Sequence, residues 1–200
     1  MKRVGVTQRQ LPVTATGEVR FALDERWSHF LWDVGIMAIA LPNVPDVALS
    51  TAKELDLDGI ILSGGGDLAN YGGDSPNRDE TERSLLSWAI EEGKPLLGVC
   101  RGMELVADVM GCTLVRIEGH VGVKNHVEGP LITGSVTCYH DWAIKDVPTS
   151  LVGLAWSGDV LEAFATPDGG VLSVMWHPER EWPNNPAATQ LVQDHFGAAS

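Results

Sequence analysis

One cysteine of this chain lies in a sequence that is typical of a nucleophile on a sharp turn. Cys100 stands at the centre of Gly98-Val99-Cys100-Arg101-Gly102, between an apolar run over 95–99 and a stretch of helical spacing that ends at Gly111. Small residues two positions to either side let the chain bend tightly between a strand and a helix. The helix N-terminus favours negative charge, so we expect it to lower the pKa of the thiol. A buried cysteine that merely packs as a small apolar side chain is the alternative reading of this motif.

A histidine and a glutamate near the end of the chain supply what a cysteine nucleophile needs. Trp176-His177-Pro178-Glu179 closes an apolar stretch over 171–176 that predicts a strand. In extended chain the side chains of His177 and Glu179 point the same way. The imidazole would take the proton of Cys100 and return it to a leaving amine, while the carboxylate holds the tautomer of the ring. Cys100, His177 and Glu179 are therefore the predicted catalytic residues, although the last two residues taken alone also fit an ordinary turn.

The composition is that of a globular protein and restricts its partners. The 200 residues carry a formal net charge of −13, with 44% hydrophobic and 20% charged residues. This acidic balance argues against binding a nucleic-acid polymer or a membrane surface, and no apolar run approaches the roughly 20 residues that span a bilayer. Cys100, Cys112 and Cys138 have no disulfide-framework spacing, and the N-terminus has no signal-peptide core. We expect a cytoplasmic enzyme, with a homodimer left open.

Strand and helix patterns alternate in the first half of the chain and give way to strands in the second. Strands are predicted over 4–7, 36–41, 59–62, 95–99, 113–117, 131–138, 151–156, 160–165 and 171–176. Helices are predicted over 24–35, 46–55, 79–92, 101–110 and 185–196. This order predicts one α/β domain over residues 1–200, a flavodoxin-like three-layer sandwich with a mostly parallel central sheet and antiparallel strands in the C-terminal half.

Taken together, these motifs resemble the class I glutamine amidotransferase-like family. The family pattern is a Gly-rich loop after a strand, then Gly-x-Cys-x-Gly, then His-Pro-Glu. Its free-standing γ-glutamyl hydrolase branch, typified by γ-glutamyl-γ-aminobutyrate hydrolase, resembles the chain further at Arg78-Asp79 with Glu82, at 135–140, at 160–163 and at 175–180. In length and in the ending Trp-His-Pro-Glu-Arg, the chain also resembles small hydrolases that cleave a γ-glutamyl nucleotide amidate, γ-glutamyl-CDP-amidate, in capsular phosphoramidate synthesis.

The resemblance implies a cysteine-dependent hydrolase that releases glutamate from a small-molecule γ-glutamyl amide. It implies a γ-glutamyl thioester on Cys100, no cofactor, and an oxyanion hole made by the backbone N–H groups of Gly65 and Arg101. The substrate contacts it implies are Gly64, Gly66, Glu104, His140 and Asp141. Many family members have glutamine where this chain has Glu104. A carboxylate there would attract the α-ammonium of the substrate and repel its α-carboxylate, and a surface carboxylate favoured by the helix dipole is the alternative.

Other polar residues carry weaker predictions. The glycines over 64–66 also fit a plain turn or a phosphate-binding loop, but no Walker-type Lys-Ser/Thr follows them. His120 and His126 belong to no ligand set of recognised spacing, so we predict no metal site. The candidates for contacting a phosphate-bearing leaving group are Arg9, Arg20, Arg78 and Arg101.

Two other functions compete with the stand-alone hydrolase. A glutaminase subunit that delivers ammonia to a synthase partner would carry the same catalytic residues. A catalytically silent binding protein on this fold is the third reading, and the intact Cys100, His177 and Glu179 count against it.

Overall fold

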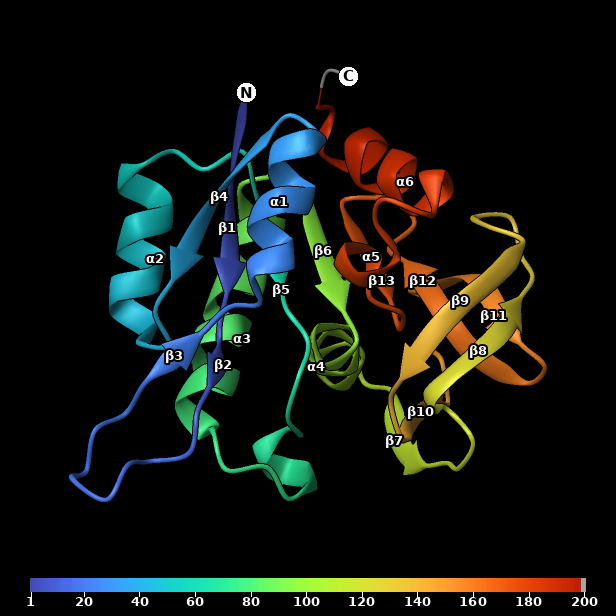
Figure 1. Ribbon diagram of the computed structural model, residues 1–200, viewed down its shortest axis with the longest axis horizontal. Helices are drawn as coiled ribbons and strands as arrows, with labels where there is room; N and C mark the ends of the chain where they lie inside the picture. The colour runs from blue at the N-terminus through green and yellow to red at the C-terminus, as the bar shows by residue number, and fades with distance from the viewer. Residues whose placement is uncertain (199–200) are drawn as a thin grey trace.

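A seven-stranded sheet forms the centre of the computed structural model, which describes residues 1–198 (Figure 1). Its order is β11-β12-β13-β6-β5-β1-β4. The parallel part consists of β13 (Val171–Val174), β6 (Leu96–Val99), β5 (Gly59–Leu62), β1 (Lys2–Thr7) and β4 (Ile36–Leu41). At one edge, β12 (Val160–Ala165) and β11 (Val152–Ser157) continue the sheet in antiparallel pairing. The predicted mostly parallel sheet with antiparallel C-terminal strands is confirmed.

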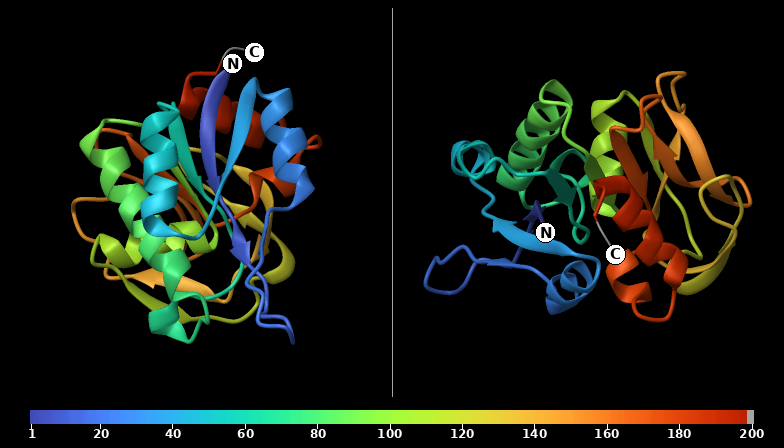
Figure 2. Two further views of the ribbon diagram at one scale, coloured as in Figure 1. Left: turned by 90° about the vertical axis from the view of Figure 1, so that its left-hand side faces the viewer. Right: turned by 90° about the horizontal axis from the view of Figure 1, so that it is seen from above.

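Helices cover both faces of this sheet (Figure 2). One layer contains α2 (Pro45–Glu54), α3 (Pro76–Glu91) and α4 (Arg101–Val109), and the other contains α1 (Glu25–Asp33) and α6 (Pro186–Phe196). Because successive side chains of a strand face opposite sides, Ile60 and Leu62 pack under the first layer and Ile61 under the second. The three-layer sandwich is therefore confirmed. No helix within residues 1–198 combines the length and apolar character needed to cross a membrane.

The chain between α4 and β11 departs from the predicted elements. A two-stranded ribbon of β8 (Val121–Val127) and β9 (Gly134–Tyr139) stands beside the antiparallel edge of the sheet (Figure 1). The strand predicted over 131–138 thus begins at Gly134, and β8 was not predicted because most of its residues are exposed and its apolar alternation of Val121, Val123 and Val127 is interrupted at Asn125. The smaller elements are β7 (Thr113–Arg116) paired with β10 (Trp142–Lys145), the hairpin of β2 (Arg9–Gln10) and β3 (Phe21–Ala22), η1 (Ala69–Tyr71) and α5 (Pro178–Glu181).

The carboxyl ends of three neighbouring parallel strands bring the predicted catalytic segments together. The glycine loop (residues 64–66) follows β5, Cys100 follows β6, and His177 comes shortly after β13. These three strands are neighbours in the sheet, in the order β13-β6-β5. Open α/β sheets bind their ligands at this edge. The topology therefore places segments more than a hundred residues apart in sequence at one edge of the sheet.

Candidate active site

Cys100 occupies the turn between β6 and α4 that the sequence predicts. Its φ of 52° and ψ of −111° form a backbone conformation that residues with a side chain rarely adopt. Two glycines make the turn possible. A Cβ on Gly98 would lie 2.9 Å from the carbonyl oxygen of Gly102, and a Cβ on Gly102 would lie 2.1 Å from that of Leu62. The close packing of strand against helix therefore requires glycine on both sides of the cysteine.

Two backbone N–H groups lie against the Cys100 thiol. They belong to Gly65 and Arg101, and both hydrogen bonds favour the thiolate and so act to lower the pKa of Cys100. Gly65 has a φ of 92°, which a residue with a Cβ would adopt only with strain. These are the two donors predicted for an oxyanion hole. Fixed N–H groups beside a nucleophile are suited to receive the negative charge that develops on an attacked carbonyl oxygen.

The pKa of the Cys100 thiol is nevertheless raised to about 12. Burial is the largest cause, the negative charge of Glu104 is the next, and the hydrogen bonds from Arg101 and Gly65 oppose them only in part. The N–H of Arg101 at the helix N-terminus acts in the expected direction, but desolvation outweighs it, so the predicted net lowering of this pKa is wrong. The resting thiol carries its proton, so a base has to remove that proton when the sulfur attacks.

His177 and Glu179 form a buried hydrogen-bonded pair. Nδ1 of His177 lies 2.7 Å from Oε1 of Glu179, and the two residues are 3% and 1% exposed. The backbone is extended only at His177, which precedes α5, and Glu179 lies in the first turn of that helix. The predicted extended geometry is thus wrong, although the predicted pairing forms. Because a carboxylate only accepts hydrogen bonds, it holds the proton on Nδ1 and leaves the lone pair on Nε2.

Gly64 fills the small space between the cysteine and the histidine. A Cβ on Gly64 would lie 3.2 Å from the Cβ of Cys100, 2.6 Å from Cε1 of His177 and 3.2 Å from Nε2 of the same ring. The position of this Cβ is thus close to both residues, so Cys100 and the imidazole of His177 face each other across Gly64. A side chain at position 64 would displace the imidazole.

An aromatic side chain from the ribbon forms one wall beside the imidazole. The ring of Tyr139 packs edge-on against His177 with 5.8 Å between the ring centroids. The guanidinium of Arg180 lies 4.6 Å over the Tyr139 ring, and its Nε lies 3.6 Å from Oε1 of Glu179. The ribbon strand β9 therefore contributes to the position of the predicted base.

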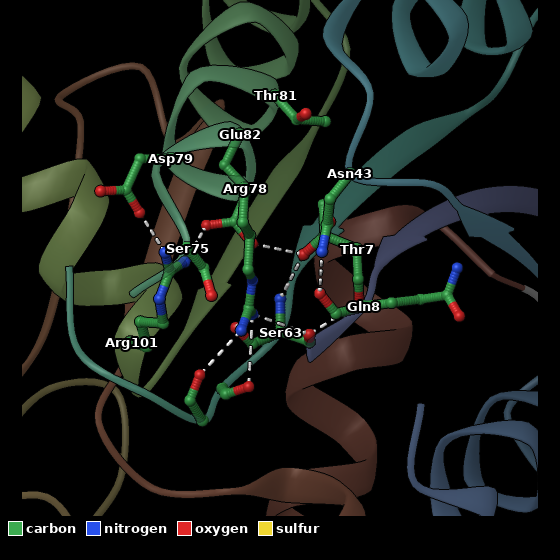
Figure 3. Close-up of polar contacts among 12 residues, drawn as sticks. Thr7, Gln8, Asn43, Ser63, Ser75, Arg78, Asp79, Thr81, Glu82 and Arg101 are labelled. Carbon is green, nitrogen blue, oxygen red and sulfur yellow. Dashed lines mark hydrogen bonds and ion pairs between the residues drawn. The ribbon is translucent and has the colours of Figure 1, made fainter. Parts of the chain in front are cut away.

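A buried network of charges lies behind the glycine loop and the cysteine turn (Figure 3). Glu82 of α3 is fully buried and binds both Arg78 and Arg101, with 2.8 Å between its Oε1 and Nε of Arg78. Arg101 also binds Asp79, and Thr7 of β1 donates a 2.7 Å hydrogen bond to Glu82. Burial alone would raise the pKa of Glu82, but the charges of Arg101 and Arg78 outweigh it and hold that pKa below its usual range. Glu82 is therefore ionised at neutral pH.

Arg78 connects this network to the glycine loop. Its Nη1 donates to the carbonyl oxygen of Gly65 at 2.7 Å, and its Nη2 donates to the carbonyl oxygens of Ser63 at 2.5 Å and Gly64 at 3.3 Å (Figure 3). The carbonyls of the loop thus turn toward Arg78, while the N–H of Gly65 turns toward the thiol. Arg78 positions one predicted oxyanion donor, and Arg101, bound to the same carboxylate, carries the other.

Glu104 lies in the first turn of α4 and is buried rather than on the surface. It is 3% exposed, and its pKa is raised to about 7, chiefly by burial, while the charges of Arg101 and His140 act to lower it. The surface alternative for this residue is therefore wrong. Its charge acts on the Cys100 thiol, because it is the second cause of the raised pKa of that thiol.

Replacing Glu104 with Gln is expected to lower the pKa of the Cys100 thiol. Loss of the negative charge makes the thiolate easier to form, so alkylation of Cys100 by iodoacetamide becomes on the order of tenfold faster at pH 8. The pKa of Glu104 is raised to about 7, so the two proteins should differ above pH 7 and converge below it, where Glu104 is protonated. Peptide mass spectrometry at Cys100 measures the rate, with Glu91→Gln on an exposed position of α3 as control. Equal alkylation rates for wild type and Glu104→Gln at pH 8 would contradict the conclusion that the charge of Glu104 raises the pKa of Cys100.

The remaining predicted substrate contacts have different surroundings. Gly66 is exposed and has a φ of 80°. Asp141 binds Arg116, whose Nη2 also lies 3.0 Å from Oδ2 of Asp67. His140 is 2% exposed and faces Glu162 rather than open space. The contacts predicted for these three residues stay predictions, and His140 lies deepest of them.

His120 and His126 do not come together. His126 is exposed and lies 3.2 Å from Glu128, whereas His120 turns inward toward Glu162, at 3.1 Å. Cys138 and His140 surround the same carboxylate. This group was not predicted from the sequence because its members come from separate strands, and the i, i+2 spacing of Cys138 and His140 was the available signal.

One of the four candidate arginines lines a cavity next to His177 and Glu179. Arg78 and Arg101 are 1% exposed and belong to the buried network, and Arg20 binds Glu18 at the surface. Arg9 lines a cavity of about 250 Å³ whose wall includes Gly64, Gly65, Trp27, His177 and Arg180. Arg9 and Arg180 are therefore the positive groups that a ligand in this cavity would meet.

The sequence matches a protein family and is similar to individual known proteins. The family model described as Peptidase C26 matches residues 4–133. The gamma-glutamyl-CDP-amidate hydrolase of Campylobacter jejuni is 32% identical over 203 aligned residues, which cover 96% of this chain and 96% of that protein. A subunit of the glutamine-hydrolyzing GMP synthase of Haloarcula marismortui is 32% identical, over 64% of this chain and 67% of that protein.

A solved structure has the same fold. A Thermoplasma acidophilum protein described as a subunit of GMP synthase superposes with a TM-score of 0.74, covering 98% of this chain and 93% of that one, at 19% sequence identity. The arrangement of sheet and helices is therefore shared at low sequence identity.

Proposed function

The chain belongs to the Peptidase C26 family of class I glutamine amidotransferase-like proteins, and from that premise we propose that it hydrolyses a γ-glutamyl amide through a thioester on Cys100. One observation carries the proposal. The N–H groups of Gly65 and Arg101 lie against a thiol that faces the His177–Glu179 pair across Gly64. A nucleophile, a base with an orienting carboxylate, and two oxyanion donors are the parts that acyl transfer requires.

The reaction begins with proton transfer from Cys100 to His177. Because the pKa of the thiol is raised to about 12, a resting thiolate–imidazolium pair is disfavoured, and Nε2 takes the proton as sulfur attacks the γ-carbonyl. The oxyanion that forms accepts hydrogen bonds from the N–H groups of Gly65 and Arg101, each worth about 3 kcal/mol in a dry site. His177 then gives the proton to the departing amine, and water, deprotonated by the same imidazole, hydrolyses the thioester to glutamate.

Glu104 supports recognition of a glutamyl group. Its carboxylate lies near the thiol, as its effect on the pKa of Cys100 requires, and attracts the α-ammonium of the substrate. A bound ammonium would offset the negative charge that raises the thiol pKa. The free protein therefore keeps its nucleophile protonated, and the correct substrate makes it easier to ionise.

The leaving group we propose is anionic, as in a γ-glutamyl nucleotide amidate. Arg9 and Arg180 line the cavity beside His177, where the departing side of the substrate would lie. The full-length relative described as a gamma-glutamyl-CDP-amidate hydrolase supports this choice. On this proposal, the chain acts in capsular phosphoramidate synthesis and needs no synthase partner. A glutaminase subunit is the second candidate, supported by the similarity to one component of the glutamine-hydrolyzing GMP synthase.

The test is glutamate release by the purified chain alone, measured by mass spectrometry. The substrates are glutamine, a γ-glutamyl polyamine and γ-glutamyl-CDP-amidate, and we expect the nucleotide amidate to be cleaved fastest. Arg9→Met should raise KM for the nucleotide amidate about tenfold without raising KM for the polyamine, because only the former has an anionic leaving group. Arg20→Met, at an exposed arginine bound to Glu18, is the matched control.

The outcomes separate the candidate functions. Preference for glutamine together with stimulation by a synthase partner would favour the glutaminase subunit. Turnover of none of the three substrates by pure protein would contradict the hydrolase proposal.

A further inference from the structure

Four side chains of metal-binding type meet between the β8–β9 ribbon and the central sheet. His120 directly precedes β8, Cys138 lies in β9, His140 directly follows β9, and Glu162 lies in β12. One ligand atom from each lies within 4.8 Å of all the others. Ligand atoms of a tetrahedral zinc site are about 3.3–3.6 Å apart, as its bond lengths require. Small side-chain movements would therefore close these four atoms around one ion.

The contacts of the other three side chains converge on the carboxylate of Glu162. Nδ1 of His120 lies 3.1 Å from Oε1, Nε2 of His140 lies 3.4 Å from Oε2, and Sγ of Cys138 lies 3.9 Å from each oxygen. The two imidazole rings are neighbours across the ribbon, with 4.9 Å between centroids and a 3.1 Å hydrogen bond from the His140 N–H to the His120 carbonyl. Each oxygen of the Glu162 carboxylate therefore has a histidine nitrogen and the Cys138 sulfur nearby.

His140 presents a buried nitrogen that has no hydrogen-bond partner. The residue is 2% exposed, and Nε2 is buried without a partner. Nδ1 lies 2.8 Å from the carbonyl oxygen of Trp142, which only accepts, so the ring donates from Nδ1. Histidines that bind metals commonly donate their other N–H to a carbonyl or carboxylate in this way. Nε2 is therefore the ring atom that faces the cluster, toward Glu162.

The charge of Glu162 lacks a permanent cation. The carboxylate is fully buried, and its ionic neighbours are the two histidines, with no lysine or arginine paired to it anywhere in residues 1–198. A buried carboxylate is costly unless it is paired or coordinates a metal. A divalent ion bound by this carboxylate and by the Cys138 thiolate would leave the buried group with no net charge.

We propose that His120, Cys138, His140 and Glu162 bind one zinc ion. Two imidazoles, a thiolate and a carboxylate form a borderline-soft set that suits Zn²⁺ rather than the oxygen-binding Mg²⁺ or Ca²⁺. With all four positions filled by protein, the site is structural rather than catalytic. Cys138 releases its proton when the ion binds. The side chain of Asn125, whose Nδ2 lies 2.8 Å from Nδ1 of His120, gives up that contact.

The ion would fix the ribbon strand that reaches the catalytic imidazole. Tyr139 lies between the ligands Cys138 and His140 and packs against His177. Glu162 belongs to the central sheet, so the ion joins the ribbon directly to the sheet. Its role is to hold the Tyr139 wall in place, and it takes no part in the chemistry at Cys100.

Metal binding is measured without turnover, in a Cys100→Ser background that removes the catalytic thiol as a competing ligand. Reduced protein is dialysed against EDTA and then titrated with Zn²⁺, and bound metal is counted by mass spectrometry. We expect one Zn²⁺ per chain, a rise in Tm on binding, and a thiolate charge-transfer band when Co²⁺ replaces Zn²⁺. Additional Cys138→Ser or His140→Ala substitutions should weaken binding by more than about 100-fold and remove the rise in Tm.

Cys112→Ser is the matched control, because Cys112 is also a buried free thiol and lies outside the cluster. It should bind Zn²⁺ as the Cys100→Ser protein does. No stoichiometric binding in the Cys100→Ser protein would overturn the proposal and leave a His140–Glu162 ion pair instead. Zn²⁺ binding that survives both Cys138→Ser and His140→Ala would also overturn it. If Cys138→Ser does not fold, the Co²⁺ band of the Cys100→Ser protein still decides whether a thiolate is a ligand.

Discussion

Cys100→Ala is expected to reduce glutamate release by about 10⁴- to 10⁶-fold, as loss of a catalytic nucleophile does when the residues of a site act as a unit. The proposed thioester cannot form without the sulfur, and the oxyanion donors alone leave only a small residual rate. Steady-state turnover of a γ-glutamyl amide measures the loss. Mass spectrometry of the quenched reaction should show a γ-glutamyl adduct of the wild-type chain and none of the variant.

Cys112→Ala is the control for this prediction, because Cys112 is likewise buried and has no role in the proposed reaction. It should keep wild-type turnover. The Cys100→Ala protein should keep its Tm, since the change removes a strained residue's sulfur without opening a large cavity. Turnover by Cys100→Ala within tenfold of wild type would refute the thioester mechanism.

Glu82→Ala is expected to lower the free energy of unfolding by about 3–5 kcal/mol, the loss typical of removing one partner of a buried ion pair. The substitution leaves Arg78 without its carboxylate and takes one of two carboxylates from Arg101. Urea unfolding measures the change. Glu80→Ala, two residues earlier at an exposed position of α3, should change stability by less than about 0.5 kcal/mol.

Acid should diminish the difference between wild type and Glu82→Ala. The pKa of Glu82 in the folded protein is held below its usual range, so the contribution of this carboxylate is complete above its unfolded pKa of about 4.3. It is lost as the pH falls through the lower folded pKa. A stability gap that is equally large at neutral and strongly acidic pH would contradict the ion-pair explanation.

Local pattern was sufficient to predict the fold and to place the candidate catalytic segments on it. β4, β5 and β12 have the predicted bounds, because apolar runs between turn residues specify buried strands directly. The His177–Glu179 pair was also predicted, although from an extended geometry that the short helix α5 replaces. The turn around Cys100 was recognisable because glycine is required on both sides of it.

What the sequence could not predict depends on burial and on contacts between distant residues. The direction of the Cys100 pKa is set by desolvation and by Glu104, and a helix N-terminus alone suggests the opposite. Arg78 donates hydrogen bonds to backbone carbonyl oxygens that lie 13 to 15 residues earlier in the chain. Every residue has such a carbonyl group, so the sequence does not indicate these contacts. The group around Glu162 is assembled from three strand regions and appears only after folding.

The attachment of the glycine loop to Arg78 has a consequence for how the protein can evolve. Arg78, which binds the glycine loop, and Arg101, in the turn after Cys100, both bind the carboxylate of Glu82 in α3. The spacing between the N–H groups of Gly65 and Arg101 is therefore set by α3 and not by the loop or the turn. Because these N–H dipoles are already fixed, they need not reorient as negative charge develops on a substrate oxygen. The free energy of orienting them is therefore spent during folding and not during the reaction. A change of specificity can proceed through the cavity wall at Arg9 and Arg180, whereas neither of the two proposed oxyanion donors can shift independently of the other.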